Sequence, residues 1–149
     1  MNIDKLRNEA ANGQVAAQTI LGICHLDGYE VEVNYQEAFR LLSAASARGV
    51  PRAMTNLARI YSEGLGVAKD PSEAIRLYER AAKAGEFDAQ IALGRIYSGK
   101  VEALANLDES LVWYSRALAQ ADNVAECQEI QEARAYVEAA RSAGHHVEG

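Results

Sequence analysis

Three glutamates recur at an interval of 36 residues, and evenly spaced carboxylates are candidates for acid–base groups or metal ligands. They are Glu37, Glu73 and Glu109, and each stands three residues after an Asn or Asp. The same spacing marks a helix start, where the Asn or Asp side chain accepts from a backbone N–H and the glutamate bonds back to the capping residue. We interpret these glutamates as parts of capping boxes and not as catalytic groups.

The three histidines do not have the spacing of a catalytic or metal site. His25 stands at the repeat position that Tyr61 and Tyr97 occupy, which predicts a structural imidazole at the core. His145 and His146 are adjacent and close to the C-terminal end, where such pairs bind metals only adventitiously. We therefore expect no metal site.

Other motifs that carry chemistry are missing from the sequence, which has no phosphate-binding loop, nucleophile elbow or Cys-x-x-Cys pair. Cys24 shares its repeat position with Ile60 and Ile96, so we expect a buried, reduced thiol, and Cys127 has no such equivalents. We predict a protein without enzyme activity, cofactor or small-molecule substrate. A small enzyme whose catalytic residues are scattered along the chain stays open as an alternative.

The interval of 36 residues applies to most of the chain and predicts a stack of small helical units. Alanines set the phase, and a leucine follows each of them four residues later: Ala17, Ala53 and Ala89. In the clearest copy we predict helices from Ala53 to Glu63 and from Pro71 to Ala84, with a turn at Gly64 and a cap at Asp70. Equivalent helices are expected 36 residues to either side.

The pattern resembles the Sel-one-like repeat family, a relative of the tetratricopeptide repeats. The match rests on A-x-x-x-L-G/A-x-x-Y, then G-x-G-V-x-x-D, then E-A-x-x-L/W-Y-x-x-A, in phase in three copies and covering about residues 1–121. In the middle copy the matching residues are Ala53, Leu57, Ala58, Tyr61, Gly64, Gly66, Val67, Asp70, Glu73, Ala74, Leu77, Tyr78 and Ala81. The resemblance implies an all-α fold, a right-handed α-α superhelix (solenoid) of helix-turn-helix repeats with a C-terminal capping helix.

We divide residues 1–149 as a single repeat domain. A half-repeat at 1–13 precedes repeats at 14–49, 50–85 and 86–121, and a capping helix at 122–144 and a tail at 145–149 follow. In the capping helix, one apolar side is expected to cover the last repeat: Ile130, Ala133, Val137 and Ala140.

Two repeats depart from the family pattern in the loop between their helices. The first has Glu30 where the middle copy has Gly66. The third has Gly99 one residue early and lacks the glycine pair, so we predict a reshaped loop at 99–105 in which Leu104 replaces the buried valine. Trp113 aligns with leucines of the other copies and is expected in the core.

The formal net charge of −6 argues against a general nucleic-acid binder. The N-terminal residues lack an apolar run, and no segment approaches the length of a membrane span, so we expect no signal peptide, no membrane association and a cytoplasmic location.

The resemblance implies that first helices line a concave face where partners dock. Position by position, that face would carry Thr19, Ile23, Leu26, Thr55, Arg59, Ser62, Ile91, Arg95 and Ser98. The pattern predicts that Ile23, Leu26 and Ile91 are exposed, and that Arg59 pairs with Glu63 one turn along.

We therefore predict a non-catalytic protein-binding module, an adaptor or scaffold that holds a peptide or a partner protein on its concave face. Apolar residues beside guanidinium groups suit an amphipathic peptide that bears a carboxylate. The alternative within the same territory is an inhibitor or immunity-type protein that sequesters one toxin or enzyme.

Overall fold

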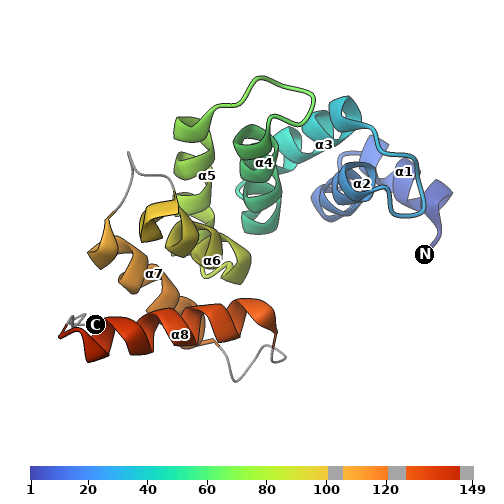
Figure 1. The fold of residues 1–149 in the computed structure, drawn as a ribbon. Coiled ribbons are helices and arrows are strands. Elements are labelled where there is room, and N and C mark those ends of the chain that lie inside the picture. Colours follow the sequence, from blue (N-terminus) through green and yellow to red (C-terminus); the bar gives the residue numbers. More distant parts are fainter. Residues whose placement is uncertain (101–105, 121–126, 145–149) are drawn as a thin grey trace. The chain divides into compact units, whose positions relative to one another are not determined.

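The computed structural model describes residues 1–100, 106–120 and 127–144, and within these residues all regular structure is helical (Figure 1). The chain forms two compact units, Met1–Ala84 and Gly85–Gly149. Each unit is described separately below.

Unit 1 consists of a lone helix followed by two helical hairpins, and consecutive helices pack on one another. The helices are α1 (Ile3–Ala11), α2 (Val15–Asp27), α3 (Tyr35–Ala47), α4 (Pro51–Glu63) and α5 (Pro71–Lys83). In the middle copy the predicted helices are confirmed, because α4 begins two residues before Ala53 and α5 ends one residue before Ala84. The helix α1 packs on α2 through a small apolar cluster: Leu6, Ala10, Ala17, Leu21 and Leu41.

Unit 2 contains one hairpin and the end helix. Its elements are α6 (Phe87–Arg95), a π-helical turn η1 (Ile96–Lys100), α7 (Leu107–Leu118) and α8 (Gln128–Ser142). In α8, Ile130, Ala133 and Val137 are buried and Ala140 is partly buried, so the predicted apolar side of this helix is confirmed. The remainder of the predicted range before Cys127, and the tail at 145–149, lie outside the described residues.

The second helix of each hairpin begins at a side-chain cap. The side-chain oxygens of Asn34, Asp70 and Asn106 accept from the backbone N–H three residues later, at 3.0, 3.1 and 3.1 Å. The predicted side-chain caps are therefore confirmed. Each cap binds a backbone N–H of the first turn that has no partner within the helix.

The predicted bond from each glutamate back to its capping residue is wrong. The backbone N–H of each capping residue donates to a carbonyl in the last turn of the preceding helix, that of His25, Tyr61 or Tyr97, at 2.9, 3.0 and 2.9 Å. The carboxylates of Glu37 and Glu73 accept from Arg40 and Arg76, three residues along their own helices. In all three repeats the capping N–H already has a backbone acceptor, and in the first two the glutamate forms charge-assisted hydrogen bonds with an arginine instead.

The hairpin loops of unit 1 share one backbone path despite their different sequences. Gly28 and Gly64 end the first helices at φ 70° and 68°, in the left-handed region that glycine adopts without strain. Gly66 has φ 70°, and Glu30 at the equivalent position has φ 58°. The first repeat thus keeps the loop of the second, although its residue there carries a side chain.

The third repeat departs from this loop, as predicted. Gly99 has φ 96° at the position where Glu63 still belongs to α4, and α6 runs into the π-helical turn before it. π-type turns shift the backbone hydrogen bonds of a helix. Near this turn, the carbonyl of Gly94 accepts from the hydroxyl of Ser110, at 2.7 Å. The predicted role of Leu104 falls outside the described residues.

Candidate functional site

Four of the nine residues predicted for the binding face are buried. They are Thr19, Leu26, Thr55 and Ile91, with exposed fractions of 4, 3, 8 and 2%. The expected exposure of Leu26 and Ile91 is therefore wrong, while Ile23 is partly exposed as predicted. Among the polar members, Ser62 is exposed, and Arg59, Arg95 and Ser98 are partly exposed.

The burial has a simple packing cause. The helix α2 contacts α1, α3 and α4, so its buried arc is wider than the single stripe that one neighbour would cover. The hydroxyls of Thr19 and Thr55 donate within their own helices to the carbonyls of Val15 and Pro51, at 2.9 and 3.1 Å, which makes their burial inexpensive. The solvent face of α2 is consequently displaced by one residue and carries Ile20 and Asp27.

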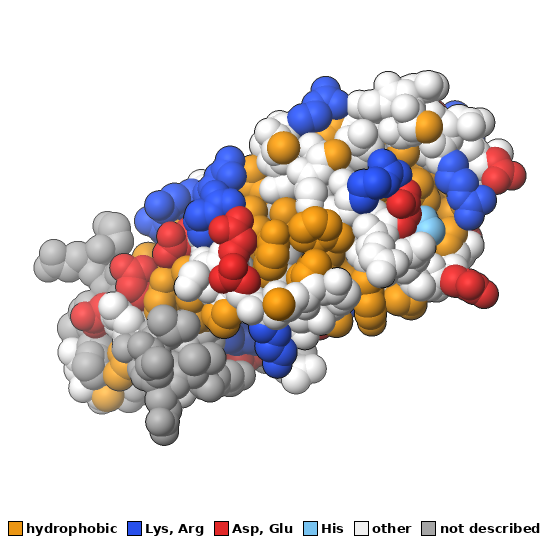
Figure 2. Space-filling model, turned by 90° about the horizontal axis from the view of Figure 1, so that it is seen from above, with side chains coloured by type: hydrophobic (Ala, Val, Ile, Leu, Met, Phe, Trp, Pro, Cys, Tyr) orange, Lys and Arg blue, Asp and Glu red, His pale blue; other side chains and the backbone are white. Residues whose placement is uncertain are grey.

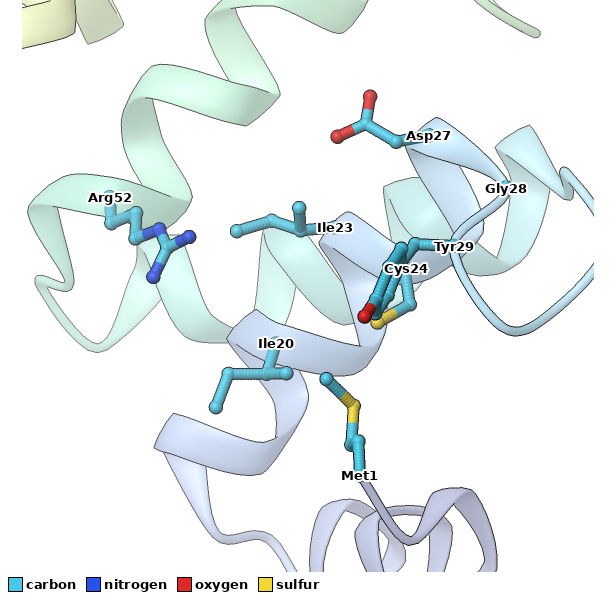
Figure 3. A pocket seen from close by; sticks show the side chains of 8 residues that line it. All are labelled: Met1, Ile20, Ile23, Cys24, Asp27, Gly28, Tyr29 and Arg52. Atoms are coloured by element: carbon cyan, nitrogen blue, oxygen red, sulfur yellow. The ribbon is translucent and has the colours of Figure 1, made fainter.

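A groove of about 620 Å³ crosses this face of α2. Figure 3 shows Ile20 and Ile23 between Arg52, which comes from the start of α4, and Met1 and Tyr29 on the other side. Ile20 is 38% exposed and Tyr29 is 59% exposed. We call this surface, built from Ile20, Ile23, Asp27, Tyr29 and Arg52, the α2 groove. The sequence-based prediction missed Ile20, Tyr29 and Arg52. Ile20 could have been found, because it lies three residues before Ile23 and therefore on the same face of a helix.

The charges at the edge of the α2 groove are unequal. Asp27 is bound by Arg59 of α4, with 3.0 Å between Oδ1 and Nη1, and Arg59 also reaches Glu63 at 3.8 Å, so the predicted pair is confirmed. Arg52 has no acidic partner in the part of the chain that the structure describes. The groove therefore presents one carboxylate that shares a guanidinium with Glu63, and one guanidinium that has no acidic partner among the described residues.

In unit 2 the equivalent arginine is held by the end helix. The Nη2 and Nε atoms of Arg95 donate to Glu132 of α8, at 2.7 and 3.0 Å. The hydroxyl of Tyr114 donates to the other carboxylate oxygen, at 3.2 Å, and its ring lies 4.9 Å from that of Tyr136. A hollow of about 460 Å³ adjoins this cluster and is lined also by Ser98.

The electrostatic effects in this cluster follow from burial and from the shared carboxylate. Hydrogen bonding to Glu132 raises the pKa of Arg95, and burial raises the pKa of Tyr114, with the charge of Glu132 adding to it. Glu132 lies 37 residues from Arg95 in an element outside the repeats, so neither spacing nor repeat phase pointed to the pair.

The described residues do not gather a metal site, and Cys24 and Trp113 are buried as predicted. In the described ranges no three His, Cys, Asp or Glu side chains lie together as a metal site. Cys24 is a buried free thiol, and burial raises its pKa, while Trp113 is 4% exposed, so both core predictions are confirmed. On the face seen in Figure 2, basic and acidic side chains lie close to one another with apolar side chains between them. None of the described helices is long and apolar enough to cross a membrane.

These features define an all-α protein built from helical-hairpin repeats. The model of the Sel1 repeat family matches residues 15–50, 51–86 and 87–122, and the chain belongs to this family. The recognition of Sel-one-like repeats from the sequence is thus confirmed.

Solved structures support the same fold class, an α-solenoid of helical repeats. A Sel1 repeat protein from Oxalobacter formigenes superposes with a TM-score of 0.72 at 34% identity, covering 92% of this chain and 97% of that one. A protective antigen of uropathogenic Escherichia coli with an SLR fold superposes with a TM-score of 0.74 at 24% identity. That match covers 94% of this chain but 33% of the antigen, so it concerns the fold alone. No curated protein matches the sequence.

Proposed function

We propose that the chain is a non-catalytic adaptor that holds a partner protein or peptide against the exposed faces of its first helices. Sel1 repeats are generally protein-interaction modules, which supports the class of function. The proposed contact surface keeps Ile23, Arg59 and Ser62 from the predicted face and adds the residues of the α2 groove.

The observation that carries this proposal is the solvent-exposed apolar surface on α2. Ile20 is 38% exposed and Ile23 is partly exposed, although α2 is covered on its other sides by three helices. Apolar side chains that remain open beside charged ones are typical of partner-binding surfaces. We assign the principal contact to unit 1 because the exposed apolar side chains of the α2 groove lie there.

Affinity capture with matched variants tests the proposal. We expect the wild-type chain to retain a partner from a lysate of the source organism, and Ile23→Glu to lose it, because the charge would enter an apolar contact. Ala44→Glu is the control, since Ala44 is exposed on α3 and does not line the groove. Circular dichroism establishes that both variants are folded, and calorimetry with the purified partner measures affinity.

The outcome also separates the kinds of binding. Several partners held weakly would fit an adaptor, whereas one stoichiometric partner held tightly would identify an inhibitor-type protein. A partner that Ile23→Glu retains as well as the control does would place the binding surface elsewhere.

A further inference from the structure

The α2 groove gathers exposed apolar side chains that are otherwise scattered. The described residues include six large hydrophobic side chains that are exposed, and three of them line this one groove: Met1, Ile20 and Tyr29. Ile23 lies between them in Figure 3. Clustered apolar surface of this kind can accept one large apolar side chain, because burial contributes about 25 cal/mol per Å² removed from water.

The aromatic wall of the groove is held in a strained loop. The backbone N–H of Tyr29 donates to the carbonyl of Cys24 at 3.0 Å, and the next residue, Glu30, has φ 58°. A non-glycine residue in the left-handed region is strained and persists only where the surrounding structure fixes it. The backbone of Tyr29 is therefore constrained before any partner arrives.

The polar end of the groove selects for negative charge. Asp27 is paired with Arg59, which also reaches Glu63, whereas Arg52 has no acidic partner among the described residues. Arg52 is the second residue of α4 and lines the groove. A guanidinium binds a carboxylate through charge-assisted hydrogen bonds, so Arg52 can attract a carboxylate of a partner.

We propose that the α2 groove recognises a partner segment in which an apolar side chain rests on Ile20 and Ile23 and a neighbouring carboxylate binds Arg52. This inference rests on the proposed function and specifies the chemistry of the partner: an acidic, apolar peptide segment of another protein. Guanidinium supplies the charge and orientation, and the isoleucines supply the apolar contact.

Small probes test this chemistry without knowledge of the partner. Hydrocinnamate carries an aromatic ring and a carboxylate, hydrocinnamide is its neutral analogue, and propionate lacks the ring. Each is titrated into the full chain while NMR follows the methyl groups of Ile20 and Ile23 and the Nε–H of Arg52. We expect all three signals to shift with hydrocinnamate, which should bind about threefold more tightly than the amide, as suits an exposed ion pair. Propionate should leave the isoleucine methyls unchanged.

Two charge-matched variants make the test specific. Arg52→Gln should reduce the preference for the acid to about one. Arg76→Gln removes the same charge from unit 1 outside the groove and should keep the preference. Ile20→Ser should weaken acid and amide alike.

The remaining outcomes overturn the inference. Equal binding of acid and amide to the wild type would exclude carboxylate recognition, and it would leave the adaptor function standing because partner capture is measured separately. Probe-induced NMR shifts confined to residues outside the groove would also exclude carboxylate recognition by the groove. Signals that move with protein concentration before any probe is added would assign the groove to a second copy of the chain.

Discussion

Arg59 and Arg95 occupy the same repeat position, yet the two units treat them differently. In unit 1, Arg59 binds Asp27 at 3.0 Å and Glu63 at 3.8 Å, and both carboxylates come from first helices. In unit 2, Arg95 forms two hydrogen bonds to Glu132 on the end helix, which also accepts from Tyr114. The repeat position thus determines where a side chain leaves the backbone, while the neighbouring helices determine which residue it pairs with.

The two units also differ in how closely the two helices of a hairpin pack at equivalent glycines. Gly22 and Gly94 occupy the same position, which Ala58 fills in the middle repeat. A Cβ at Gly94 would lie 2.7 Å from ring carbons of Tyr114, and one at Gly22 would lie 2.8 Å from Cγ of Leu42.

Gly94→Ala should therefore have the largest effect, a fall of about 2–3 kcal/mol in the free energy of unfolding. The ring of Tyr114 is fixed by Glu132 and Tyr136 and cannot move aside. Gly22→Ala should cost less, about 1 kcal/mol, because a leucine can change rotamer. Urea denaturation measures both, and equal losses would show that the two hairpins are packed equally tightly.

Two equivalent tyrosines should make stability depend on alkaline pH. Burial raises the pKa of Tyr78 to about 12 and also raises that of Tyr114. The unfolded chain loses these protons from about pH 10, whereas the folded chain keeps them, so stability falls as pH rises above 10 and continues to fall until the folded pKa is reached.

The loss at about pH 11 should amount to roughly 1 kcal/mol for each tyrosine. Tyr78→Phe and Tyr114→Phe should each reduce the difference in unfolding free energy between about pH 9 and about pH 11. The exposed Tyr29 provides the control variant Tyr29→Phe. A control that reduced the difference as much as the buried positions would contradict the assignment.

The strained loop of the first repeat offers a change in the opposite direction. Glu30→Gly should raise the free energy of unfolding by about 1 kcal/mol, because glycine adopts a φ of 58° without a Cβ clash. Gly66→Ala should lower it, since its Cβ would lie 2.7 Å from Cβ of Tyr35. Thermal or urea unfolding of the pair tests this, and a destabilised Glu30→Gly would mean that the glutamate side chain contributes more than the strain costs.

The smallest expected effect concerns the two arginine partners themselves. Glu132→Gln should lower the free energy of unfolding by roughly 0.5–1 kcal/mol, because it weakens bonds to Arg95 and Tyr114 that are partly buried. Asp27→Asn should cost only a few tenths, since Arg59 keeps Glu63 and the pair is open to solvent. Similar losses would show that the end helix does not hold Arg95 more firmly than the repeats hold Arg59.

Local features of the fold could be predicted from the sequence because their causes lie within a few residues. The caps at Asn34, Asp70 and Asn106 and the helix ends at Gly28 and Gly64 depend on neighbouring backbone groups. A fixed period then transfers each local prediction to the other copies.

The candidate site was less predictable because its features depend on several helices at once. Thr19 and Leu26 are buried since α2 has three helical neighbours, which periodicity in one helix does not report. The bond between Arg95 and Glu132 joins a repeat to a helix outside the repeats, and the groove around Ile20 requires α4 and a loop to be placed beside α2.

The backbone bond from each capping residue to the preceding helix has a consequence for amide hydrogen exchange. The N–H groups of Asn34, Asp70 and Asn106 belong to solvent-exposed residues, yet each is closed on a helix carbonyl at 2.9–3.0 Å. Such an amide exchanges with solvent only when its hairpin opens. Three protected amides, spaced by 36 residues, would therefore report the opening of each repeat separately, as one residue-specific probe per hairpin.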